Sequence, residues 1–342
     1  MYLEKYHDVD LSKLSFLVTG GAGFIGSNLV EYLMKYNAKK VVVLDNLSTG
    51  NSENLEPFEG QSNYTFIKGD ITDVNDCKIA MEGIDYVLHQ AALGSVPRSI
   101  KDPISTNNAN INGFLNILVS AKESDSVKRI VYAASSSTYG DSVVLPKVEG
   151  KIGKPLSPYA VTKYVNELYA DVFYKTYGLE TIGLRYFNVF GPKQDANGAY
   201  AAVIPKFINK ILKGEDVVIN GDGTHSRDFT YIENVVQANI KAILTANTSA
   251  IHQVYNVAYG ERININKLIT SIKECLEVYN VFSKSKIVYG PERQGDVKHS
   301  LADISKAFQL LNYEPKFSFS KGMSETVLWF YKKTGVKFIV KK

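Results

Sequence analysis

The sequence predicts an α/β protein built on a doubly wound parallel sheet, with a smaller mixed α/β domain at its C-terminal end. Two observations predict this fold. Short apolar runs alternate with longer amphipathic stretches through the first half of the chain, as strands alternate with crossover helices in parallel sheets. In addition, a glycine-rich turn, Thr19–Gly26, joins the first apolar run to the first amphipathic stretch, which is typical of Rossmann-type folds.

The apolar runs have the length of buried strands, and the stretches between them have the periodicity of helices. The predicted strands span residues 16–19, 41–44, 65–67, 86–89, 129–132 and 181–185. The predicted helices span residues 26–36, 77–81, 113–124 and 159–176. After Phe187 the pattern changes to helices, loops and short strands. We therefore assign residues 1–187, joined again by residues 229–259, to one domain and residues 188–342 to the other.

The composition is that of a globular protein, with 45% hydrophobic and 22% charged residues among 342. The net charge of +4 comes from scattered lysines, so we expect no nucleic-acid partner. No apolar run is long enough for a membrane span or a secretory signal, which favours a cytoplasmic location. The two cysteines, Cys77 and Cys275, lie far apart and predict no disulfide. We expect no metal site.

The glycine-rich turn predicts a dinucleotide site. Gly20 permits the tight turn, Gly23 lets the backbone approach a pyrophosphate, and Gly26 lets helix and strand pack closely. The first N–H groups of the following helix favour the phosphates. The spacing of these glycines meets the common dinucleotide fingerprint only approximately, so the motif needs support from other residues.

Residues at the ends of the next strands supply that support. Asp45 ends the second strand, where a carboxylate binds the adenosine ribose hydroxyls and repels a 2′-phosphate, so NAD is expected rather than NADP. The alternative for Asp45 is an ordinary acid in a turn. Asp70 and Ile71 are expected to flank the adenine, although Asp70 also fits a loop acid. Small residues follow Gln90, at Ala91 and Ala92, where backbone passes close to the cofactor.

Tyr159 and Lys163 lie one turn apart on one face of a predicted helix. The ammonium is expected to favour the phenolate and to lower the pKa of Tyr159 towards neutrality. Ser157 is a capping residue before this helix, and Ser135 or Ser136 at an earlier strand end is expected to align a substrate hydroxyl. A basic phenol beside a nicotinamide would take the proton of an alcohol while hydride leaves its carbon. The alternative for the pair is an exposed amphipathic face.

Together these residues resemble the extended short-chain dehydrogenase/reductase family. The resemblance is closer to UDP-sugar 4-epimerases, and closest to the bacterial subgroup that acts on UDP-N-acetylglucosamine and UDP-N-acetylgalactosamine. It runs from Leu17 to about Trp329. The motifs that carry it are residues 45–50, 89–92, 94–99, 184–191, 197–203, 227–231 and 293–296.

The resemblance implies a set of ligand-binding residues. Tyr159 would be the acid/base, Lys163 its partner, and Ser135 or Ser136 the residue that aligns the sugar O4. The implied NAD-binding residues are Gly20, Gly23, Phe24, Ile25, Gly26, Asp45, Asn46, Ser48, Thr49, Gly50, Asp70, Ile71, Gln90, Ala91, Ala92, Asn110, Tyr159, Lys163 and Tyr186. The implied UDP-sugar-binding residues are Gly94, Ser95, Ser137, Asn188, Gln194, Ala202, Val203, Arg227, Arg293, Asp296 and Ser300.

The resemblance also implies the reaction. The enzyme would invert C4 of a UDP-N-acetylhexosamine through a transient 4-keto sugar, for surface polysaccharide synthesis, and would form a homodimer. Arg227 and Arg293 would clamp the diphosphate, and the small Ser300 would leave room for an N-acetyl group. Open alternatives are a UDP-N-acetylglucosaminuronate or UDP-glucose 4-epimerase and a non-catalytic NAD-binding sensor. A 4,6-dehydratase is a weaker alternative, because dehydratases carry an Asp-Glu pair at the position where this sequence has residues 135–138 with no carboxylate.

Overall fold

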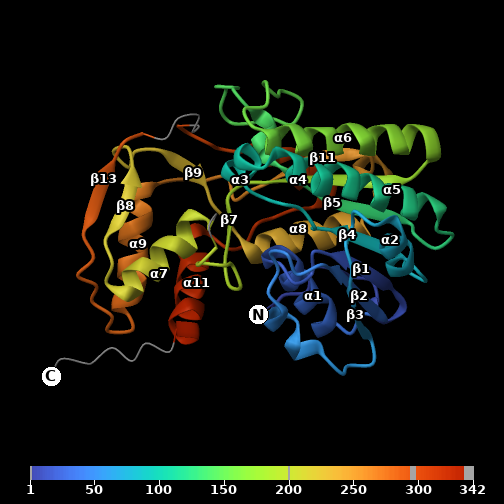
Figure 1. Cartoon of the computed structure of the whole chain (residues 1–342), viewed down its shortest axis with the longest axis horizontal. Helices are drawn as coiled ribbons and strands as arrows, with labels where there is room; N and C mark the ends of the chain where they lie inside the picture. Colours follow the sequence, from blue (N-terminus) through green and yellow to red (C-terminus); the bar gives the residue numbers. More distant parts are fainter. Residues whose placement is uncertain (1, 199–200, 293–297, 335–342) are drawn as a thin grey trace.

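The computed structural model describes residues 2–198, 201–292 and 298–334. A sheet of seven parallel strands lies at its centre, in the order β11-β6-β5-β4-β1-β2-β3 (Figure 1). Its strands are β1 (Ser15–Thr19), β2 (Lys40–Asp45), β3 (Tyr64–Lys68), β4 (Tyr86–His89), β5 (Arg129–Ser135), β6 (Glu180–Tyr186) and β11 (Gln253–Val257). The predicted doubly wound parallel sheet is therefore confirmed.

The strand order reverses beside β1. The chain first builds outward through β2 and β3, and then crosses to the other side of β1 and builds through β4, β5 and β6. Ligands bind in doubly wound sheets at such a switch point, beyond the carboxyl ends of the strands. Each predicted strand is present, and β5 continues past the predicted end to Ser135. The edge strand β11 was not predicted as a strand; its parallel partner is β6.

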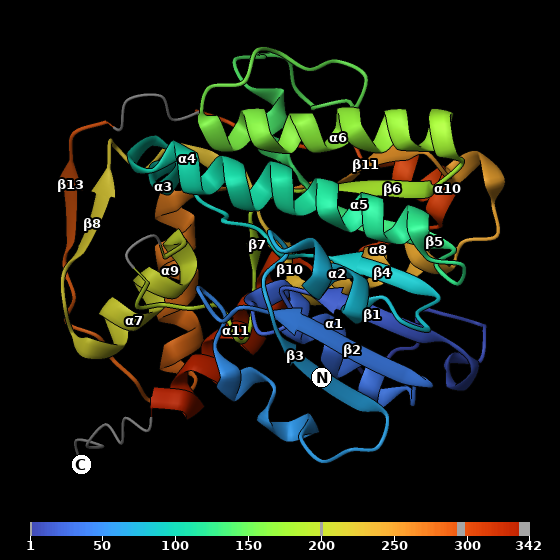
Figure 2. The same cartoon turned by 45° about the vertical axis from the view of Figure 1, so that its right-hand side comes forward.

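Helices cover both faces of the sheet (Figure 2). On one face lie α1 (Phe24–Lys35) and α8 (Ile232–Leu244), which pack against each other. On the other lie α2 (Val74–Ala80), α5 (Gly113–Glu123) and α6 (Pro158–Tyr177). Alternate strand side chains serve the two cores: Phe16 and Val18 of β1 belong to the first, and Leu17 to the second.

Helix α6 shows the local signals that begin and end it. The hydroxyl of Ser157 accepts the Ala160 N–H at 3.2 Å, and Pro158 takes the first helical position. Gly178 ends the helix in the left-handed conformation, with φ +71°. The short helices are α3 (Val96–Lys101), α4 (Pro103–Asn107), the 3-10 turns Leu11–Lys13, Ser52–Asn54, Glu56–Phe58, Ser136–Tyr139 and Thr248–Ala250, and a π turn, Asn108–Asn112.

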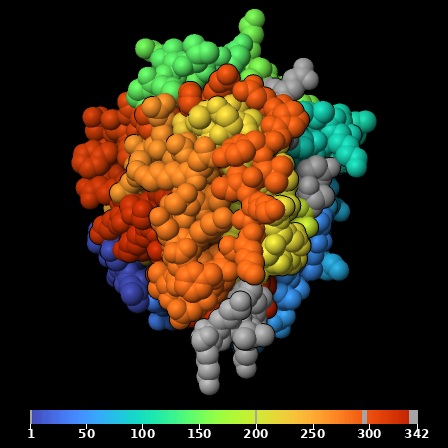
Figure 3. All heavy atoms as spheres, turned by 90° about the vertical axis from the view of Figure 1, so that its left-hand side faces the viewer, coloured from blue at the N-terminus to red at the C-terminus, as the bar shows by residue number. Residues whose placement is uncertain are grey.

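The second region lies to the left of the sheet in Figure 1, and Figure 3 shows its outer face. Its helices are α7 (Val203–Lys213), α9 (Ile265–Glu277) and α11 (Phe319–Thr334), whereas α10 (Ser305–Leu311) packs beside β11 at the edge of the sheet (Figure 2). Its strand pairs are β7 (Val189–Phe190) with β10 (Thr230–Tyr231), β8 (Val217–Asn220) with β13 (Ile287–Gly290), and β9 (Ser226–Asp228) with β12 (Arg262–Asn264). None of the helices in the described part of the chain has the length and apolar character needed to cross a membrane.

Candidate active site

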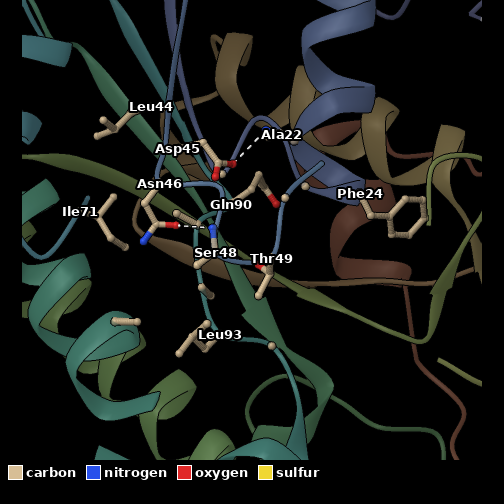
Figure 4. Close-up of a pocket in the computed structure, with 18 of the residues that line it drawn as sticks. Ala22, Phe24, Leu44, Asp45, Asn46, Ser48, Thr49, Ile71, Gln90 and Leu93 are labelled. Atoms are coloured by element: carbon tan, nitrogen blue, oxygen red, sulfur yellow. Dashed lines mark hydrogen bonds between the residues drawn. The ribbon is translucent and has the colours of Figure 1, made fainter. Parts of the chain in front are cut away.

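A cavity of about 570 Å³ lies at the carboxyl ends of the strands around the switch point. Its walls come from the β1–α1 turn, the end of β2, residues 69–72 after β3 and residues 90–94 after β4. Figure 4 shows Asp45, Asn46, Ile71 and Gln90 around this cavity. The cavity forms here because the strands are parallel, so the residues that follow each strand lie at the same edge of the sheet.

At two positions of the glycine turn beside this cavity, the structure has no room for a Cβ atom. Gly20 has φ +68°, and a Cβ on it would lie 2.7 Å from the backbone N of Ala91. A Cβ on Gly26 would fall on the carbonyl of Gly20. Gly23 caps α1 and borders the cavity, so the backbone and the first N–H groups of α1 are open to an anion. These residues fit a bound dinucleotide pyrophosphate.

Asp45 lies in the cavity wall with its side chain mostly buried. Its Oδ2 accepts the Ala22 N–H at 2.9 Å and its Oδ1 accepts the Leu47 N–H at 2.8 Å. Burial raises the pKa of this carboxyl above its ordinary value, and the two backbone bonds act in the opposite direction. The carboxylate is thus held in one orientation, with lone pairs left for a ribose hydroxyl.

Most of the predicted NAD-binding residues line this cavity. They are Gly20, Gly23, Phe24, Ile25, Gly26, Asp45, Asn46, Ser48, Thr49, Gly50, Asp70, Ile71, Gln90, Ala91 and Ala92. Asn110 does not line it; its side chain bonds the backbone of Leu93 and the hydroxyl of Thr162. Tyr186 also lies outside the cavity wall, and its role as a cofactor contact stays a prediction.

The hydroxyl of Tyr186 contacts Gln90, which lines the cavity. This hydroxyl donates to Gln90 Oε1 at 3.1 Å or to Asn239 Oδ1 at 3.2 Å. Asn239, which is buried in α8, also accepts the Gln90 Nε2–H at 3.2 Å and donates to the Tyr186 oxygen at 2.9 Å. This closed set of three holds the Gln90 amide in one orientation.

Two cations of the cavity wall were missed by the sequence analysis. Arg98 lies in α3, within the resembling motif 94–99, so the motif itself was a signal for it. Lys193 follows β7 and reaches α1, where its Nζ pairs with Glu31 at 2.7 Å. Only the tertiary fold brings Lys193 to this wall, and nothing in the local sequence pattern marks it.

The predicted acid/base pair, Tyr159 and Lys163, lies on α6 and does not line this cavity, so its contact with the cofactor stays a prediction. Tyr159 is the second residue of the helix, and Ser135, the last residue of β5, lies close enough to act on the pKa of its phenol. Ser135 also accepts the Ser137 N–H at 3.1 Å and its hydroxyl at 2.9 Å. Of the two candidate serines, Ser135 is the one that acts on the pKa of Tyr159, whereas Ser136 begins the next 3-10 turn.

Lys163 is buried one turn along α6, and its Nζ donates to the carbonyl oxygen of Ala133 at 2.7 Å. Burial lowers the pKa of Lys163 to about 8. Burial also raises the pKa of Tyr159 above its ordinary value, an effect partly offset by the nearby Ser135 side chain. The expected lowering of the Tyr159 pKa is therefore wrong where only the groups of the protein act on the phenol, because a phenolate shielded from water loses its hydration.

Several predicted substrate residues are held by bonds to strands β7 and β9. Asn188 has φ +31° and donates from Nδ2 to the Asp228 carbonyl at 3.2 Å. Arg227 bonds the carbonyls of Ser226 and Lys298 at 3.0 and 3.1 Å. Gln194 donates to the Val189 carbonyl at 3.1 Å. Its Oε1 is buried and has no hydrogen-bond partner among the described residues, so it is free to accept from a ligand.

The remaining predicted substrate residues come from several loops. Gly94 is exposed at the cavity edge, and Ser95 caps α3 through the Arg98 N–H at 3.2 Å. Ala202 precedes α7 and Val203 begins it. Arg293 and Asp296 lie outside the described residues. In the described part of the chain, no group of three or more His, Cys, Asp or Glu residues could hold a metal ion.

Comparison with known proteins covers both regions of the chain. The model of the NAD dependent epimerase/dehydratase family matches residues 16–258. The solved UDP-N-acetylglucosamine 4-epimerase of Methanobrevibacter ruminantium M1, in complex with UDP-N-acetylmuramic acid, is 42% identical with a TM-score of 0.86. That match covers 94% of this chain and 99% of that one.

Two further relatives carry the names of 4-epimerases for other UDP-sugars. The solved UDP-glucose 4-epimerase of Thermotoga maritima, with UDP-glucose, is 37% identical with a TM-score of 0.86, over 94% of this chain and 100% of that one. The UDP-glucuronate 4-epimerase of Thermodesulfobacterium geofontis is 35% identical over 322 residues, which are 92% of this chain and 95% of the relative.

Proposed function

Since the chain belongs to the NAD dependent epimerase/dehydratase family and is an NAD-dependent UDP-sugar 4-epimerase, we propose that it interconverts UDP-N-acetylglucosamine and UDP-N-acetylgalactosamine. The observation that carries the proposal is that Tyr159, at the start of α6, lies close enough to Ser135, at the carboxyl end of β5, for the serine hydroxyl to act on the pKa of the phenol. The small residue at position 300 and the 42% identity to a UDP-N-acetylglucosamine 4-epimerase support the choice of sugar.

Tyr159 is the proposed acid and base. Its phenolate takes the proton of the sugar 4-hydroxyl, and its phenol later returns a proton to the same oxygen. Ser135 donates to or accepts from the sugar O4 and holds it in line with the phenol oxygen. When bound, NAD supplies the acceptor for the C4 hydride, the return of that hydride, and a positive charge that favours the phenolate. Lys163 adds its own charge, since each pKa unit is worth about 1.4 kcal/mol.

The proposed UDP contacts lie apart from the reacting carbon. Arg227 would bind the diphosphate through its planar fork, and Asn188 and Gln194 would bind the rest of the substrate. Arg293 and Asp296 are proposed to join them from outside the described residues. Anchoring through UDP lets the 4-keto sugar turn within the pocket and present its other face, which inverts C4.

The substrate proposal is tested with purified protein and separate UDP-sugars, with NMR detection of the products. Conversion of UDP-N-acetylglucosamine with a higher kcat/KM than UDP-glucose, UDP-glucuronate or the N-acetylated uronate supports it. A preference for UDP-glucose or a uronate would replace the proposed substrate. The variant Tyr159→Phe should bind UDP-N-acetylglucosamine normally and lose about 10²–10⁴-fold in kcat. Turnover undiminished in this variant would exclude the proposed role of Tyr159.

The position of Ser300 allows a sharper test of the sugar choice. The side chain of Ser300 is partly exposed, and its N–H donates to the Ser226 carbonyl at 3.1 Å. In the variant Ser300→Tyr the larger side chain should reduce kcat/KM for UDP-N-acetylglucosamine while UDP-glucose is still converted. Equal losses for both sugars would show that residue 300 does not border the acetamido group.

We also propose a homodimer formed through α5 and α6. These helices lie side by side on one face of the sheet (Figure 2). The face of α6 turned away from the sheet exposes Val161, Leu168 and Val172, and apolar patches of this kind suit a subunit interface. Analytical ultracentrifugation should give twice the chain mass, and Leu168→Glu should give the monomer. We further propose that the enzyme is cytoplasmic and supplies UDP-sugars for surface polysaccharide synthesis.

A further inference from the structure

Asp228 is fully buried in β9, directly after Arg227. Its Oδ1 accepts the N–H groups of Tyr259 and Gly260 at 3.2 and 3.3 Å. Its Oδ2 accepts the N–H groups of Gly260 and Ala302 at 3.1 and 3.3 Å. One carboxylate therefore joins β9 to two separate segments, the loop after β11 and the segment around Ala302.

The segment around Ala302 carries Ser300, the proposed wall of the sugar pocket. Strand β9 holds it at two points: the Ser226 carbonyl accepts the Ser300 N–H at 3.1 Å, and Asp228 accepts the Ala302 N–H. Arg227 lies between these two points in β9. The bonds made by Ser226 and Asp228, the two chain neighbours of Arg227, therefore set the distance between Arg227 and Ser300.

Asn188 is tied to the same place. Its Nδ2 donates to the Asp228 carbonyl at 3.2 Å, and its own carbonyl accepts the Thr230 N–H at 3.2 Å. These bonds hold Asn188 in the positive-φ conformation. Three proposed substrate residues thus take their positions around Asp228.

We infer that Asp228 is a positioning residue of the sugar pocket, whose carboxylate fixes the Ser300 segment relative to Arg227 and Asn188. The inference rests on the proposed function. A carboxylate suits this place because it accepts several N–H bonds and brings no donor of its own. An amide of the same shape would turn its NH2 group towards one set of these N–H groups. Burial raises the pKa of Asp228 to about 6, a cost that the N–H bonds partly offset.

The variant Asp228→Asn tests the inference. Loss of two well-placed acceptor positions should loosen the Ser300 segment and raise KM for UDP-N-acetylglucosamine about tenfold. The kcat value should change much less, because Tyr159 and Ser135 lie on other elements. The ratio of kcat/KM for UDP-N-acetylglucosamine to that for UDP-glucose should fall, and bound NAD per chain should stay unchanged. This ratio comes from one preparation, so partial unfolding does not alter it.

Glu233→Gln is the matched control. Glu233 is also a buried carboxyl group, but it accepts the Tyr6 hydroxyl at 2.8 Å and serves the N-terminal segment, so its variant should keep the wild-type selectivity. An unchanged ratio in Asp228→Asn, or a loss of kcat alone, would overturn the inference. If this variant is insoluble, Asp228→Glu, which moves the charge by one methylene, is judged by the same ratio. A wild-type protein that converts none of the UDP-sugars would instead overturn the proposed function.

Discussion

The ammonium of Lys163 donates to the main-chain carbonyl of Ala133 at 2.7 Å, which docks α6 on β5 two residues before Ser135. This bond fixes the charge of Lys163 at the strand end that also holds the hydroxyl of Ser135. Lys163 therefore both orients α6 and supplies a cation near Tyr159, and its variants should separate these two contributions.

Replacement of Lys163 by Met should lower kcat about 100-fold or more, because the phenolate of Tyr159 loses a nearby cation. The acid limb of the pH profile of kcat/KM should move to higher pH, since the phenol then ionises less readily. Lys163→Arg, which keeps the charge, should retain a profile close to that of the wild type. A Met variant with reduced kcat but an unshifted profile would limit Lys163 to the docking of α6.

Loss of the Glu167–Arg185 pair should destabilise the protein strongly. The Arg185 fork binds both carboxylate oxygens of Glu167 at 2.8 and 2.7 Å, and both side chains are buried. Glu167→Gln leaves a buried cation without its counter-ion, which costs about 3–5 kcal/mol. Urea unfolding should report this loss. Lys175→Met, which breaks only an exposed ion pair on the same helix, should cost less than about 1 kcal/mol.

Replacement of Gly26 by Ala should weaken NAD binding and lower the unfolding temperature. The added methyl group would collide with the Gly20 carbonyl and push α1 away from the turn that borders the cavity. Fluorescence titration with NAD and thermal unfolding measure the two effects. Gly150→Ala is the control, because a Cβ on Gly150 meets no atom within 4 Å. Equal behaviour of the two variants would contradict the close packing of α1 on the turn.

Protonation of His89 should contribute to acid destabilisation. Burial, followed by the charge of Lys163, lowers the pKa of His89 to about 3, and its Nδ1 is bonded to the Thr19 hydroxyl at 2.8 Å. The unfolded chain, with a pKa of about 6.5, therefore binds the proton more tightly than the folded protein. Stability from this group is present above about pH 6.5 and is lost as the pH falls towards 3.

The comparison of wild type with His89→Asn isolates this effect. The free energy of unfolding of the variant, measured in urea between pH 4 and 7, should depend less on pH than that of the wild type. The packing that the Asn side chain cannot replace lowers the free energy of unfolding by an amount that does not change with pH. Parallel curves over this range would show that His89 does not take up the proton on unfolding.

Local pattern was sufficient for the elements of the sheet and for the turn residues. Strand β1 and helix α6 are marked within a few residues, by an apolar run and by Ser157 and Gly178. The edge strand β11 was missed, because its pairing with β6 depends on contacts between residues far apart in the chain.

The residues of the site likewise divide into those marked by a local sequence pattern and those placed by tertiary contacts. Gly20 and Asp45 could be placed at the cavity from the sequence, because a strand end or a helix turn sets their surroundings. Lys193 and Asn239 reach the site only through tertiary packing, and no local spacing marks them. The pKa of Tyr159 was misjudged for the same reason, since sequence shows which residue lies one turn away but not how deeply the phenol is buried.

The place of β11 beside β6 affects how the chain folds as it is made. Until residue 257 has left the ribosome, β6 lacks its outer neighbour, and an unpaired strand invites pairing with another chain. At about 5–20 residues per second, this interval lasts on the order of several seconds. The Arg227 segment is synthesised within it, so the nascent protein completes its sheet only after much of its second region has emerged.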